Sequence, residues 1–105
     1  MGKHEIAAVG DAASVLVFRA AGVETVFAEN PAEAERAVRA LAAEGCRVIF
    51  VTERLLEQLP DLAAHYRRTA YPAVIPIPGR DGPTGYGAGK IAENMEKAIG
   101  TSLLQ

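Results

Sequence analysis

The sequence has few of the side chains that commonly bind metals or take part in catalysis. It contains one cysteine, two histidines and no tryptophan. A single cysteine, Cys46, excludes an internal disulfide and is typical of a reducing cytosol. No His or Lys lies close to it in sequence, so we expect an inert thiol. One cysteine and two histidines also make a structural zinc site close to impossible. The net charge of −2 and a pI near 5.6 argue against a nucleic-acid partner.

Long hydrophobic runs are also missing. The longest apolar stretch falls well short of the roughly 20 residues that a membrane-spanning helix needs. The N-terminal residues 1–5 are charged and carry no apolar signal-peptide core. We therefore expect a cytoplasmic chain with no segment inserted in a membrane.

Alanine dominates what is present. Half of the 105 residues are hydrophobic, and 20 of these are alanine, against 23 valines, isoleucines and leucines together. A chain of this length is one domain, able to bury roughly two-thirds of its unfolded surface. Because alanine side chains add little to a core, further stability is expected to come from a partner.

Apolar runs and helical patterns alternate along the chain. We expect strands over 5–9, 23–28, 47–51 and 71–78, and helices over 11–21, 31–44, 53–58 and 61–68. Asp11 and Asn30 are predicted N-caps, and Pro31 and Glu33 suit the first turn of the second helix. Pro60 is expected to interrupt the third helix, because its ring clashes with the preceding turn.

Strands separated by helices predict an α/β fold with a small, Rossmann-like (flavodoxin- or receiver-like) parallel sheet and helices on both faces. The expected order is 2-1-3-4, with the proline-rich fourth strand at an edge. We expect a Rossmann-like domain over 1–78, then a glycine-rich hinge and C-terminal helix over 79–105. The sequence leaves open whether that helix completes one compact unit or extends to a partner.

The carboxyl ends of the strands are where open parallel sheets bind ligands. A receiver domain would place a phosphoacceptor Asp at the end of the third strand, but this position is Thr52. Asp11, Asn30 and Thr52 are better interpreted as helix caps. The loop 85–90 lacks the first Gly and the final Ser or Thr of a phosphate-binding P-loop, which favours a hinge.

Other candidate sites are equally incomplete. An enzyme built on Asp11 or Glu53 would need an acid–base pair in a pocket, and the sequence shows no specific pairing. His4 and His65 have no Ser or Cys partner in a recognisable triad. Arg54 with Arg67 and Arg68 is either a basic patch or, as we favour, a solvated helix face. We thus expect no catalytic residue, no metal site and no cofactor.

An ordered set of residues spans nearly the whole chain. The set comprises Gly10-Asp11, Ser14-Val15, Phe18, Gly22-Val23, Glu29-Asn30-Pro31, Val48-Ile49-Phe50-Val51-Thr52-Glu53, Pro72-Ala73-Val74-Ile75, Ile77-Pro78, Gly85, Gly87 and Glu96-Lys97-Ala98-Ile99-Gly100. In this order and at this spacing, the residues resemble the F subunit of the vacuolar/archaeal-type rotary ATPases, which are also called V-type ATP synthases. The resemblance implies a Rossmann-like domain followed by a C-terminal helical segment.

In function, the resemblance implies a non-catalytic rotor component. It would bind the coiled coil of the D subunit in the central stalk, and through it the A/B catalytic hexamer and the membrane rotor. This places the chain peripherally on a membrane-bound complex that couples ATP turnover to proton or sodium transport. The apolar residues Ile91, Met95 and Ile99, with Tyr86 nearby, are our candidate partner interface. The alternative is a stand-alone receiver-like or nucleotide-binding regulatory domain without a phosphoacceptor Asp.

Overall fold

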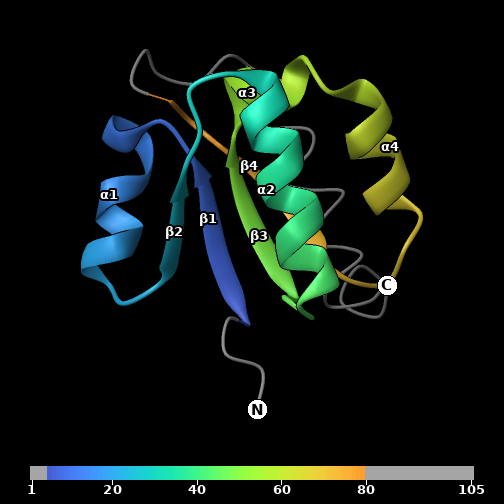
Figure 1. Ribbon diagram of the computed structural model, residues 1–105, viewed down its shortest axis with the longest axis horizontal. Coiled ribbons are helices and arrows are strands. Elements are labelled where there is room, and N and C mark those ends of the chain that lie inside the picture. The colour runs from blue at the N-terminus through green and yellow to red at the C-terminus, as the bar shows by residue number, and fades with distance from the viewer. Residues whose placement is uncertain (1–4, 80–105) are drawn as a thin grey trace, which may run out of the picture.

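Figure 1 shows the computed structural model, which describes residues 5–79. Four strands alternate with helices along this range, as predicted. The elements are β1 (Ile6–Gly10), α1 (Ala12–Ala20), β2 (Glu24–Phe27), α2 (Pro31–Ala43), β3 (Val48–Thr52), α3 (Glu53–Glu57), α4 (Pro60–Arg67) and β4 (Ala73–Ile77).

The four strands form one parallel sheet in the order β2-β1-β3-β4, which confirms the predicted topology. Val9 of β1 lies in register with Val26 on one side and with Val51 on the other. Parallel neighbours need a crossover connection, and a helix supplies each one here. Pro76 pairs in register with Val51 in the edge strand β4, where a residue without an N–H group is tolerated.

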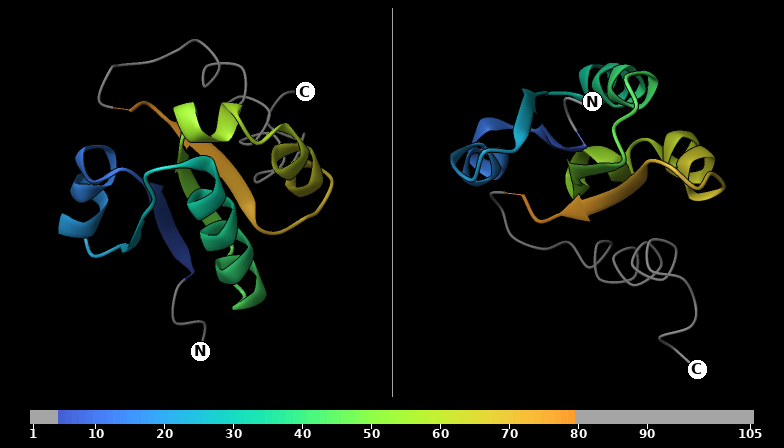
Figure 2. Two further views of the ribbon diagram at one scale, coloured as in Figure 1. Left: turned by 45° about the horizontal axis from the view of Figure 1, so that its top comes forward. Right: turned by 90° about the horizontal axis from the view of Figure 1, so that it is seen from below.

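The helices cover the two faces of the sheet unequally. The larger core lies between the sheet and α2, α3 and α4, and Val38, Leu56 and Leu62 are among its buried anchors. A smaller cluster lies on the opposite face, where α1 is the one described helix (Figure 2). The helices therefore lie on both faces, as expected.

The smaller cluster also modifies one expectation about β3. Its nearly continuous apolar sequence predicts a strand buried on both faces. Ile49 and Val51 are fully buried against the larger core, but Val48 and Phe50, on the face shared with α1, are only partly buried. Among the described elements, the face of β3 toward α1 is therefore less completely covered than the face toward the larger core.

Local capping explains where the two longest helices begin. The Asp11 Oδ2 atom accepts a hydrogen bond from the Ser14 amide at 3.2 Å, which confirms this N-cap of α1. At α2, the Asn30 Oδ1 atom accepts from the Glu33 amide at 2.9 Å. The Glu33 carboxylate reaches back to accept from the Glu29 amide at 2.8 Å, one residue earlier than in the usual capping box. Both capping predictions are therefore correct.

The third helical segment is divided into two pieces near Pro60, as predicted, but the proline belongs to the second piece. We predicted helical pieces over 53–58 and 61–68 with the proline between them. Instead, Pro60 is the first residue of α4, after a break at Gln58 and Leu59. The first helical position suits proline because its missing N–H would have no partner there and its fixed backbone angle is already helical.

Several expectations lie outside the described range. The C-terminal helix, the glycine-rich loop and the division into 1–78 and 79–105 remain predictions. Within residues 5–79, no helix is both long enough and apolar enough to cross a membrane.

The cap of α2 can be tested directly. Replacing Asn30 with Ala removes the acceptor for the Glu33 amide and should lower the free energy of unfolding by about 0.5–2 kcal/mol. Urea denaturation followed by circular dichroism would measure the change. Asn30→Asp is the matched control, because it keeps a side-chain oxygen and should stay near the parent stability. Equal losses in both variants would contradict the capping role.

Candidate functional site

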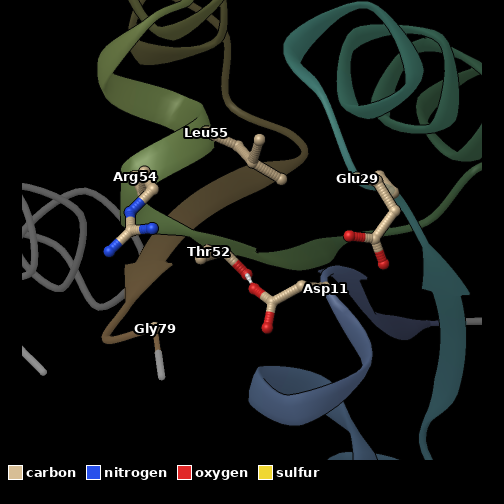
Figure 3. A pocket seen from close by; sticks show the side chains of 7 residues that line it. Asp11, Glu29, Thr52, Arg54, Leu55 and Gly79 are labelled. Atoms are coloured by element: carbon tan, nitrogen blue, oxygen red, sulfur yellow. Dashed lines mark hydrogen bonds between the residues drawn. The ribbon is translucent and has the colours of Figure 1, made fainter. Parts of the chain in front are cut away.

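The carboxyl ends of the strands meet around one small cavity, as the topology predicts (Figure 3). Its volume is about 90 Å³. The lining residues come from the strand ends and from the segments that follow them: Asp11, Ala28, Glu29, Thr52, Arg54, Leu55 and Gly79. Typical small-molecule sites measure roughly 300–1,000 Å³, so this space is too small for a nucleotide.

Asp11 is held by its own helix. Its Oδ1 atom accepts from the Ser14 hydroxyl at 2.8 Å, and its Oδ2 atom accepts from the Ser14 amide at 3.2 Å. Both carboxylate oxygens thus serve the first turn of α1. A carboxylate used in this way is a structural cap, as the sequence pattern predicts.

Thr52 differs from the sequence-based expectation. It occupies the N-cap position of α3, but its side chain makes no capping hydrogen bond. Instead, the Thr52 hydroxyl points across the strand ends and donates weakly to Asp11 Oδ1 at 3.5 Å (Figure 3). The prediction of a Thr52 cap is therefore wrong, because the hydroxyl is directed toward Asp11, which follows β1, and makes no bond to the first turn of α3.

Two glycines allow the strand ends to approach so closely. A Cβ atom at Gly10 would collide with the Thr52 hydroxyl oxygen and lie 3.3 Å from Val15 Cγ1. At Gly79, a Cβ atom would lie 3.2 Å from Thr52 Cγ2. The 2%-exposed Thr52 side chain thus fills the space between two positions without side chains. The sequence gives no signal for this contact, since a glycine after a strand also suits an ordinary turn.

The proposed acid–base residues do not come together at this cavity. Asp11 lines it, whereas Glu53 is not among its lining residues and is buried at 1% exposure. A general acid and base must both reach the same substrate. The structure therefore does not bring these two carboxylates together at the cavity.

The candidate basic patch is divided as well. Arg54 lies at the carboxyl-terminal ends of the strands, where it lines the cavity. Arg67 is the last residue of α4, and Arg68 follows it. The chain then leads to the start of β4, at the amino-terminal ends of the strands. All three residues are exposed, which agrees with solvated helix surfaces.

A second hollow lies near the amino-terminal ends of the strands and measures about 360 Å³. It lies beside Cys46, Arg47 and the cis Tyr71–Pro72 peptide bond. The Arg47 guanidinium lies 4.3 Å from the centre of the exposed Tyr71 ring, a cation–π contact. The Cys46 thiol is 2% exposed and donates to the Val48 carbonyl at 3.3 Å. Burial raises the pKa of this thiol, which keeps it protonated and agrees with the predicted inert thiol.

The candidate partner interface is not among these features. Tyr86, Ile91, Met95 and Ile99 lie outside the described residues, as does His4. His65 is described, and its ring packs edge-on against Tyr66 with centroids 4.6 Å apart. Within residues 5–79, no group of three or more His, Cys, Asp or Glu side chains is arranged to hold a metal ion.

Comparisons with known proteins agree over nearly the whole chain. Residues 6–95 match the ATP synthase (F/14-kDa) subunit family. The V-type ATP synthase F subunit of Fusobacterium nucleatum is 37% identical over 101 residues, covering 96% of each chain. The V-type F subunit of Clostridium perfringens is 38% identical over 100 residues, covering 95% of each chain. The A-type ATP synthase F subunit of Methanothermobacter thermautotrophicus is 32% identical, covering 95% of this chain and 96% of that one.

The contact between Gly10 and Thr52 can be tested with two substitutions. Gly10→Ala should destabilise the fold by about 1–3 kcal/mol, because the added methyl group meets the Thr52 hydroxyl. Adding Thr52→Ala removes that oxygen and should recover part of the loss. Urea unfolding of both single variants and the double variant would measure the coupling. Strictly additive losses would show that the two residues do not collide.

The buried thiol provides a chemical test. Alkylation of Cys46 by iodoacetamide at pH 8 should be about tenfold slower or more in the folded chain than in urea, because burial raises the thiol pKa and blocks access. Mass spectrometry would follow the modification. The chain contains no other cysteine, so the unfolded sample is an internal control. Equal rates in the two samples would mean that the thiol is accessible in the folded state.

Proposed function

The chain belongs to the ATP synthase (F/14-kDa) subunit family, and on this basis we propose that it is the rotor F subunit of a V-type ATPase or ATP synthase. The observation that carries the proposal is the continuous likeness to F subunits over about 95% of both chains. The match includes the segment after Gly79, so it is not a likeness to a Rossmann-like domain alone.

We further propose that this chain has no catalytic role. The cavity at the carboxyl edge supports this, because its Asp11 caps a helix and its Thr52 stands where a receiver domain needs a carboxylate. A part that transmits torque or regulates ATP turnover needs a stable shape and a partner surface. The cavity of about 90 Å³ at the strand ends is too small for a nucleotide, which argues against the alternative of a stand-alone nucleotide-binding regulator that binds there.

The proposed partner is the D subunit, the coiled-coil component of the central stalk. Through this partner, the chain would act on the A/B catalytic hexamer and on the membrane rotor. Its place is then in the cytoplasm, peripheral to the membrane, where it helps to couple or regulate ATP turnover with proton or sodium transport.

For the contact with the D subunit we propose the C-terminal residues Ile91, Met95 and Ile99, together with Tyr86. The support comes from the sequence: apolar residues repeat at helical spacing after a glycine-rich hinge. A short helix with one apolar stripe depends on packing for its stability.

The experiment is co-expression of the full chain with its cognate D subunit, followed by pull-down and titration of the purified proteins. We expect a stable complex with the parent chain. Ile91→Glu or Met95→Glu should weaken binding by about tenfold or more, because a charge enters an apolar contact. Glu93→Gln is the control within the same segment, and it should bind like the parent chain because its position falls off the apolar stripe.

Reconstitution with the A/B hexamer completes the test. The complex containing the parent chain should change the ATPase rate, and the Ile91→Glu chain should fail to do so at equal concentration. If the parent chain does not bind the D subunit, the proposed function is wrong. If both charge variants bind like the parent chain and melt at its temperature, only the proposed C-terminal interface is wrong.

A further inference from the structure

Helix α1 carries two apolar stripes. The inner stripe, Val15 and Phe18, faces the sheet: Val15 is fully buried, and the Phe18 ring stacks on Phe50 with centroids 5.1 Å apart. On the other side, Leu16 is 49% exposed and Val17 is 67% exposed. A helix that is apolar on all sides is normally a buried helix.

The exposed residues follow the spacing of a helix–helix contact. Ala13, Leu16, Val17 and Ala20 occupy positions i, i+3, i+4 and i+7, and all four are exposed; we refer to them as the outer stripe. Residues at this spacing form one continuous ridge along a helix. The small alanines at the two ends leave room for a second helix to approach the larger central side chains.

Helix α2 shows what a solvated surface of this molecule looks like. Its exposed positions include Glu33, Arg36 and Arg39, and Arg39 forms an exposed ion pair with Glu35 at 3.0 Å. By contrast, α1 contains one charged residue in nine, Arg19. The outer stripe therefore has the composition of a covered surface, although no element within residues 5–79 covers it.

The edge strand β2 also has an exposed aromatic residue, which contacts α1 through Arg19. Phe27 is 46% exposed, and the Arg19 guanidinium lies 5.8 Å from the centre of its ring. This places one positive charge beside the apolar surface. A complementary helix would carry an apolar stripe with an acidic residue at its flank.

The size of the surface limits the possible occupant. Nine helical residues extend about 14 Å. A single ridge of that length offers much less contact area than the roughly 800 Å² per partner that a stable dimer of two chains buries. The occupant must therefore be held by another contact as well, which favours a partner already bound elsewhere on the chain.

We propose that the outer stripe of α1, extended by Phe27, packs against a helix of the coiled-coil stalk partner, the D subunit. This inference rests on the proposed function and adds a second contact surface to it, on the Rossmann-like domain. The C-terminal residues and the outer stripe would then hold the same partner at two points, so that loss of either one weakens the complex without abolishing it.

The test compares Val17→Glu with Ala40→Glu in the full chain. Both substitutions place a carboxylate at an exposed helical position, the first in the outer stripe and the second on α2. Titration against the purified D subunit should show binding weakened by about tenfold or more for Val17→Glu and unchanged for Ala40→Glu. Val17→Ala should weaken binding less than Val17→Glu. All three variants should melt close to the parent chain.

The outcomes separate this inference from the proposed function. If the parent chain binds the D subunit and Val17→Glu binds equally well, the outer stripe is not the contact, and the proposed function stands. Failure of the parent chain to bind the D subunit overturns both.

Two other results would assign the stripe to a different occupant. A marked loss of thermal stability in the isolated Val17→Glu chain, but not in Ala40→Glu, would assign the stripe to the chain's own C-terminal segment. A change from dimer to monomer in sedimentation would assign it to a second copy. Either result overturns the inference.

Discussion

The structure depends on one constraint: a parallel sheet is apolar on both faces and must be covered on both. The central strands β1 and β3 bury Ala7, Val9, Ile49 and Val51 against α2, α3 and α4. The other face is covered among the described elements by α1 alone, through Val15 and Phe18. The described helices therefore cover the two faces of the sheet unequally.

Part of the alanine content belongs to the core, whereas other alanines, such as Ala13 and Ala40, are exposed. Ala7, Ala8, Ala28 and Ala34 have no exposed surface, and they lie where a strand or helix comes close to its neighbour. Small side chains permit short distances between layers, but each contributes little apolar area. The larger residues Leu56 and Leu62 supply that area on one face only. Among the described residues, the larger core therefore lies on the face covered by α2, α3 and α4.

At the carboxyl-terminal ends of the strands, the described residues enclose a cavity of about 90 Å³. Asp11 is engaged by the first turn of α1, and Thr52 fills the space that Gly10 and Gly79 leave open. These contacts close the region where related architectures bind ligands. The same contacts join α1 to β3, so the edge serves to hold the helices in place. This fits a family whose members are subunits of a larger machine.

Much of the fold can be predicted from the sequence alone, because the deciding interactions are local. The alternation of strands and helices, the caps at Asp11 and Asn30 and the edge position of the proline-rich strand all follow from patterns within a few residues. The identity of the family also follows from the order of residues along the chain. By contrast, the direction of the Thr52 hydroxyl and the openness of Leu16 and Val17 depend on segments far away in sequence. In α1, Leu16 and Val17 are as apolar as Val15 and Phe18, and only packing against the sheet decides which of these pairs is buried.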